Sequence, residues 1–173
     1  MTDNIDAINF ALLVTRVCLG LSLAMHGYGH FFRGGKIQGT GRWFASLGMK
    51  PGIFHAWLAS LTEFGAGFGF ALGLLTPLCA AGFVGLLFVA VWLVHRFNGF
   101  FVLKEGWEYV TVLMVVAVCV GTIGPGEWSL DHALSIDDNL SGWTGLAIGA
   151  GLGMAAAIGT LAVFYRPPAK TES

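Results

Sequence analysis

The sequence predicts an all-α, integral membrane helical bundle, and three observations lead to this fold class. The 173-residue chain is 55% hydrophobic and only 11% charged, whereas a soluble domain carries about 25% charged residues. Its mean hydropathy is +0.74, and long apolar stretches alternate with short polar connections. Apart from Arg16, the Lys and Arg residues fall in connections on one side of these stretches. We therefore expect a single membrane bundle without a soluble domain.

Five stretches approach the length of about 17 to 25 mostly apolar residues that a membrane-spanning helix needs. They are residues 10–31, 54–75, 78–97, 109–123 and 144–165, of which the fourth is the shortest. The second and third are joined by Leu75-Thr76-Pro77, so we expect an antiparallel hairpin. The connection 34–52 mixes basic and aromatic residues, which is consistent with an amphipathic segment in the headgroup layer or with a tethered loop.

The charge pattern predicts the orientation of the chain. By the positive-inside rule the basic connections are cytoplasmic, which puts the N-terminus outside and the C-terminus in the cytoplasm. We expect a multi-pass protein of the bacterial cytoplasmic (inner) membrane, surrounded by membrane lipid. The first stretch follows acidic residues and not a basic segment, so we expect an uncleaved anchor. The net charge of -1 gives no reason to expect nucleic-acid binding.

Two groups of ionisable residues lie at membrane depth. Counting from the span ends places Arg16 and Glu63 at similar depths on the first two spans, so we expect them to form a buried ion pair. Nearer the cytoplasmic side, a second group should line a pocket; its members are His26, His30, His95 and Glu108. The alternatives are a purely structural ion pair and interfacial side chains held by water and headgroups.

Several short segments occur in the order that is found in a known family. They are Arg16 with Leu19-Gly20, His26-Gly27, Glu63 in Glu-Phe-Gly-Ala-Gly, Leu72-Gly73-Leu74-Leu75-Thr76-Pro77, His95 before Asn98-Gly99-Phe100-Phe101, Gly106-Trp107-Glu108-Tyr109, and Gly124-Pro125-Gly126 before Ser129-Leu130-Asp131. In this respect the chain resembles the DoxX family of small four-helix membrane proteins. His30 departs from the pattern, since we expect Lys there. The resemblance divides the chain into a DoxX-like four-helix unit (1–133), an acidic extracytoplasmic loop (134–143), and a fifth span with a short cytoplasmic tail (144–173).

The resemblance implies a membrane component of quinone-linked oxidoreductase systems, such as thiosulfate:quinone oxidoreductase or an assembly with superoxide dismutase and a sulfurtransferase. A quinone needs a hydrogen-bonding or proton-exchanging group at each carbonyl, between apolar walls. We assign the catalytic proton donors as Glu63 and Glu108. The candidate quinone-binding residues are Arg16, His26, His95, Tyr28, Trp92 and Trp107.

Other functions compete with this hypothesis. His26 and His95 could ligate haem, whereas a metal site is not expected because the histidine run lacks the Glu of catalytic zinc motifs. The chain could instead be a non-catalytic anchor or assembly subunit, or a proton-coupled transporter of a small solute. Glycines recur every four residues at 65–73 and at Gly145, Gly149 and Gly153. Such stripes pack helices, and the second could contact the bundle, a second copy of the chain or another subunit.

Overall fold

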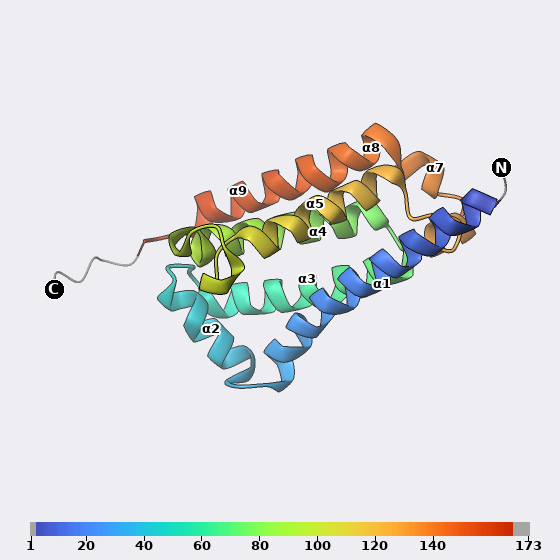
Figure 1. Cartoon of the computed structure of the whole chain (residues 1–173). Helices are drawn as coiled ribbons and strands as arrows, with labels where there is room; N and C mark the ends of the chain where they lie inside the picture. Colours follow the sequence, from blue (N-terminus) through green and yellow to red (C-terminus); the bar gives the residue numbers. More distant parts are fainter. Residues whose placement is uncertain (1–2, 168–173) are drawn as a thin grey trace.

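A computed structural model describes residues 3–167 and shows a bundle of helices with no strand among those residues (Figure 1). The fold class predicted from the sequence is therefore confirmed. The longer helices are α1 (Asp3–Phe32), α3 (Gly52–Leu72), α4 (Thr76–Leu93), α5 (Glu108–Ile123) and α9 (Gly153–Phe164). The shorter segments are α2 (Lys36–Ser46), 3-10 turns at His95–Asn98 and Val102–Lys104, α6 (Leu130–Ala133), α7 (Asp137–Leu140), α8 (Gly142–Leu146) and a π-helical stretch, Ala147–Leu152, that joins α8 to α9.

Three helical segments are long and apolar enough to span a bilayer, namely Asn4–Phe32, Thr76–Leu93 and Gly142–Phe164. Both remaining expected spans are helical but do not meet this requirement. Helix α5 is apolar but only 16 residues long. Helix α3 has 21 residues, and its polar residues His55 and Glu63 lower its hydropathy. Because α3 packs along α1 and α4, its polar side chains can be enclosed by protein.

Glycines bring α1 and α3 into backbone contact. A side chain at Gly67 would collide with the backbone of Gly20 and Ala24, and one at Gly27 would meet the backbone of Ser60 and Phe64. The two helices therefore touch through main-chain atoms, which is the usual role of small residues in membrane bundles.

The glycines that recur every four residues on α3, Gly65, Gly69 and Gly73, do not make this backbone contact with α1. Gly65 faces open space, and Gly69 lies against the Cys79 sulfur. Gly73 ends α3 in the left-handed conformation (φ 65°), which glycine adopts without steric cost. The glycine that matters most for α1 packing, Gly67, lies outside the four-residue repeat.

The second glycine stripe is filled within the chain. Gly145 lies against the Gly121 carbonyl of α5, Gly149 against Ala80 and Gly153 against Val84 of α4. Of the three alternatives for this stripe, the structure shows packing within the bundle, because these glycines hold the last helix against α4 and α5.

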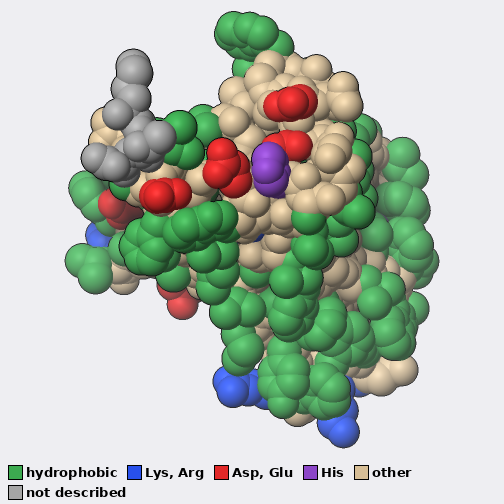
Figure 2. All heavy atoms as spheres, turned by 90° about the vertical axis from the view of Figure 1, so that its right-hand side faces the viewer, with side chains coloured by type: hydrophobic (Ala, Val, Ile, Leu, Met, Phe, Trp, Pro, Cys, Tyr) green, Lys and Arg blue, Asp and Glu red, His purple; other side chains and the backbone are tan. Residues whose placement is uncertain are grey.

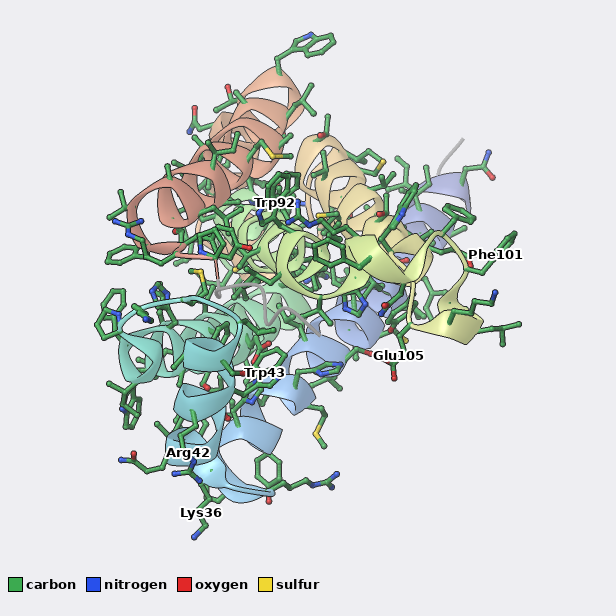
Figure 3. All side chains as sticks on the ribbon, turned by 90° about the vertical axis from the view of Figure 1, so that its left-hand side faces the viewer. Lys36, Arg42, Trp43, Trp92, Phe101 and Glu105 are labelled. Atoms are coloured by element: carbon green, nitrogen blue, oxygen red, sulfur yellow. The ribbon has the colours of Figure 1, made fainter. Side chains whose placement is uncertain are left out.

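Charge is segregated between the two ends of the bundle. The end that carries α2 and the 3-10 turns is called here the basic end; its cations are Arg33, Lys36, Arg42, Lys50, Arg96, Lys104 and Arg166. Lys36 and Arg42 extend outward from α2 (Figure 3). The opposite, acidic end carries α6 and α7, and Asp and Glu side chains with a histidine gather there (Figure 2). This distribution agrees with the prediction that the basic connections lie on one side of the spans and the acidic loop on the other.

The connection after α1 forms the expected amphipathic segment as helix α2. It buries Gly41 and Phe44 and exposes Lys36, Arg42 and Trp43. Phe44 joins a core at the basic end that also contains Met49 and Leu93. A cluster that includes Phe70 and Phe83 fills the rest of the bundle.

Gly67→Ala should destabilise the protein by about 1 to 3 kcal/mol, because the added methyl group meets backbone that cannot move aside cheaply. Gly65→Ala is the matched control on the same helix, and there we expect no loss or a gain of up to about 1 kcal/mol from higher helix propensity. Unfolding of both variants in detergent micelles with increasing SDS measures the difference. Equal stability of the two variants would contradict the described α1–α3 contact.

Candidate functional site

A buried carboxylate organises the acidic end. Asp131 is fully buried and accepts hydrogen bonds from the backbone N–H of Leu75 (2.6 Å), the backbone N–H of Thr76 (2.9 Å) and the Thr76 hydroxyl (2.7 Å). Thr76 begins α4, so the carboxylate caps a helix end whose first N–H groups lack partners within the helix. It also lies at the positive end of the α4 dipole. The Asp131 N–H in turn donates to the Gly73 carbonyl at 2.8 Å.

Arg16 belongs to the same cluster. Its Nη2 donates to the Trp128 carbonyl (2.6 Å) and its Nη1 to the Ala71 carbonyl (3.3 Å). Asp131 supplies the negative charge that acts on the guanidinium. Arg16, Thr76 and Asp131, called here the Asp131 latch, thus join α1, the α3–α4 turn and the segment after α5.

The expected pair between Arg16 and Glu63 is therefore wrong. Gly20 lies beside Gly67, and Arg16 lies beside Gly73. In this antiparallel register Glu63 is level with residues near His26 of α1, ten residues from Arg16, or about 15 Å along the helix. Counting residues from assumed span ends placed the two side chains too close in depth.

Glu63 instead faces His30. The His30 Nε2 lies 3.3 Å from Glu63 Oε2, and the Glu63 side chain is only 15% exposed. The other ring nitrogen, Nδ1, lies 3.2 Å from the Thr40 hydroxyl of α2. That hydroxyl donates its proton to the Lys36 carbonyl at 3.1 Å, so it is left to accept a hydrogen bond from Nδ1.

This arrangement bears on the protonation of the pair. With a proton on Nδ1, a neutral His30 presents a bare lone pair at Nε2, which would repel a carboxylate. A favourable contact requires one proton between Nε2 and Oε2, either as imidazolium with carboxylate or as imidazole with carboxylic acid. We infer that a proton lies between His30 and Glu63, which are 3.3 Å apart.

The pair lies in the wall of an inner cavity of about 590 Å³. Helix α3 contributes residues at helical spacing, namely His55, Leu58, Ala59, Thr62 and Glu63. Apolar residues of α4 and α9 form further walls, while His26 and His30 enter from α1 and Trp43 and Phe44 from α2. The inner cavity is thus an apolar chamber with few polar groups, which is typical of small-molecule sites.

A second hollow of about 680 Å³, called here the α1 groove, runs along α1. Its wall includes Ser22, Arg33 and, from α5, Tyr109. His26 and His30 line both hollows. The two histidines therefore stand between the α1 groove and the inner cavity.

Two residues expected at the site lie in the loop at the basic end instead. The His95 Nδ1 is 2.6 Å from the Glu105 carbonyl, and Glu108 accepts a hydrogen bond from the Val102 N–H at 3.0 Å. Glu105 and Phe101 mark this loop in Figure 3. Neither His95 nor Glu108 lines a described hollow, so the geometry gives no support to haem ligation by His26 with His95.

The aromatic residues expected as quinone walls also lie elsewhere. Tyr28 contacts Phe32, with ring centroids 4.6 Å apart, and Trp107 contacts Phe100 at 4.8 Å. Trp92 lies under the Arg96 guanidinium at 3.9 Å.

Of the expected site residues, the structure brings together Glu63 and His26, which both line the inner cavity. Among residues 3–167, no three His, Cys, Asp or Glu side chains are grouped so that they could hold a metal ion.

Sequence reasoning missed His55, and it did not identify Asp131 as the carboxylate that acts on Arg16 and caps α4. The spacing of His55 and Glu63, eight residues apart with Ala59 and Thr62 between them, would place both on one helix face. For Asp131 there was no comparable local signal, because its partners lie more than fifty residues away in the chain.

The comparisons with known proteins cover the first half of the chain. The family model for DoxX matches residues 11–96, which extend from within α1 to just beyond the end of α4. No match was found among curated proteins or among solved structures. The matched residues include His30, His55 and Glu63, whereas Asp131 lies beyond them.

Asp131→Asn should destabilise the protein by about 3 kcal/mol, because it removes the charge opposite buried Arg16 and weakens the α4 cap. The matched control is Asp138→Asn at the same end, where the side chain has no described hydrogen bond. SDS-induced unfolding in micelles measures both variants. An Asp131→Asn variant as stable as the control would argue against the Asp131 latch.

The exposed pair of His132 and Asp137 gives a pH-dependent contact outside the membrane. The His132 Nδ1 is 2.8 Å from Asp137 Oδ2; this hydrogen bond raises the pKa of His132 above its ordinary 6.5 and lowers the pKa of Asp137 below its ordinary 3.8. The contact is therefore at full strength between about pH 3.8 and 6.5. It weakens as pH rises through the raised pKa of His132 or falls through the lowered pKa of Asp137.

Asp137→Asn should bring the His132 pKa down toward 6.5, as followed by NMR titration of the ring protons. Asp138→Asn should change it less, because Asp138 acts on His132 only at longer range. An unchanged His132 pKa in Asp137→Asn would show that the contact is not formed in solution.

Proposed function

The chain belongs to the DoxX family, as the match over residues 11–96 shows, and on that premise we propose that it is a membrane subunit of a quinone-linked oxidoreductase whose inner cavity binds a quinone. The observation that carries the proposal is the His30–Glu63 pair, two proton-exchanging side chains 3.3 Å apart in the wall of an apolar cavity. Quinone reduction consumes two electrons and two protons, so a quinone site requires such a proton-exchanging group.

The size and lining of the inner cavity support this proposal. Its volume of about 590 Å³ falls in the range of about 300 to 1,000 Å³ that is usual for small-molecule sites. Trp43 and Phe44 supply aromatic surface from α2, and α3, α4 and α9 supply aliphatic surface. A quinone ring would meet the polar pair while its hydrocarbon tail lay against apolar walls or lipid.

The positions of His26 and His30 support a route for proton exchange. Glu63 would give a proton to, or take one from, a quinone oxygen in the inner cavity. His30 would then restore the shared proton, because it contacts Glu63 and also lines the α1 groove. His26 lines both hollows as well and would extend this route. In this proposal the electrons come from another subunit of the assembly.

A non-catalytic anchor or assembly subunit is the second candidate, and exposed apolar residues favour it. Leu103 at the basic end is 94% exposed, and Trp143 at the acidic end is also highly exposed. Apolar side chains this exposed are suited to burial against a partner or a membrane. An anchor would co-purify with its partner and would bind no quinone alone.

Glu63→Gln should weaken binding of decylubiquinone by tenfold or more, because the variant cannot hold the shared proton that meets the quinone oxygen. Quenching of tryptophan fluorescence in lipid nanodiscs measures binding, since Trp43 lines the cavity. Glu108→Gln is the matched control, because Glu108 lies outside the cavity, and it should bind like the unmodified protein. Absence of saturable binding to the unmodified protein would overturn the proposed function.

A further inference from the structure

His55 is a buried polar side chain that lacks a partner. It is 3% exposed, and its Nε2 is enclosed with no hydrogen bond to any described residue. The ring packs against the Phe164 ring at 4.9 Å and the Phe44 ring at 6.2 Å. A buried imidazole nitrogen without a hydrogen bond is unfavourable and is uncommon in folded proteins. Because His55 also lines the inner cavity, a ligand there is the natural partner.

His55 and Glu63 mark the two ends of the α3 wall. They are eight residues apart, which separates them by about 12 Å along the helix and by about 80° around it. Leu58, Ala59 and Thr62 lie between them on the cavity wall, and the Thr62 hydroxyl is already bonded to the Leu58 carbonyl. The α3 wall therefore offers one polar group at each end with a mainly apolar surface between.

A para-quinone ring matches this spacing. Its two oxygens stand at opposite corners of the ring, about 5 Å apart given ordinary C=O bond lengths. A hydrogen bond of about 2.8 Å on each side extends the span to about 11 Å. The backbone positions of His55 and Glu63 are about 12 Å apart along α3, so the two side chains approach a ligand of this length from opposite ends. A ligand with a single polar group would meet only one end.

We propose that His55 is the second quinone-binding residue, which donates a hydrogen bond to one carbonyl of a para-quinone while the His30–Glu63 pair serves the other. The inference rests on the proposed function and specifies its ligand class as a 1,4-quinone. A neutral imidazole always carries one N–H donor, and because His55 lines the inner cavity, a ligand oxygen there can accept that hydrogen bond. The Phe44 and Phe164 rings pack against the imidazole.

The test compares two ligands on His55 variants in nanodiscs. His55→Phe, which fills similar space without a donor, should weaken decylubiquinone binding about tenfold. It should leave binding of 4-decylphenol, which has one polar group, within about twofold. His55→Gln restores a donor and should regain most of the decylubiquinone affinity. His132→Phe, a matched substitution at the acidic end, should have no effect on either ligand.

An infrared measurement identifies the contact directly and does not depend on His55→Phe being folded. Decylubiquinone labelled with ¹³C at C1 or at C4 should show two carbonyl bands, both shifted to lower frequency in the unmodified protein. One band should return to the unbonded frequency in His55→Leu and remain shifted in His55→Gln. Two shifted bands in every His55 variant would overturn the inference while leaving quinone binding intact. Failure of the unmodified protein to bind would instead overturn the proposed function.

Discussion

The arrangement of this bundle depends on the burial of the Asp131 carboxylate. A charge removed from water must be matched by donors and by an opposite charge. Asp131 finds its donors at the start of α4 and its countercharge in Arg16 of α1. One carboxylate thus joins segments that are distant in the chain and sets their relative positions at the acidic end. The acidic end has a structural role, and the proposed quinone site lies in the opposite half of the bundle.

The position of the proton-sharing pair follows from helix packing. Once Arg16 lies beside Gly73, the backbone contact of Gly20 with Gly67 sets how α1 lies along α3. That register brings His30 to Glu63. The connection after α1 then returns as α2, whose Thr40 orients the His30 ring. A tight turn, two glycines and one hydroxyl therefore determine which nitrogen of His30 faces the Glu63 carboxylate.

Much of the fold could be predicted from the sequence because apolar length and charge pattern dominate in a membrane protein. The helices and the α3–α4 hairpin follow from those patterns, whereas for the connection after α1 the sequence left an amphipathic segment and a tethered loop as alternatives, and the structure shows the amphipathic α2. The partners of Arg16 and Glu63 did not, because helix register depends on contacts between glycines, not on where apolar stretches begin. Trp92, Trp107 and Tyr28 were expected at the site, but aromatic residues near helix ends also pack on neighbouring rings or cations. The spacing of His55 relative to Glu63 indicates a shared helix face, but the importance of His55 appears only once its buried nitrogen is seen without a partner.

The central claim is that the Asp131 latch has a structural role, whereas the His30–Glu63 pair, a separate cluster, has the proposed chemical role. A double-mutant cycle on the free energy of unfolding in mixed micelles tests it most directly. Arg16→Gln combined with Asp131→Asn should show a coupling energy of about 1 to 3 kcal/mol, as expected for a buried cation and the carboxylate whose charge acts on it, whereas Arg16→Gln combined with Glu63→Gln should be additive within about 0.5 kcal/mol. Strong coupling of Arg16 to Glu63, with none to Asp131, would contradict the account.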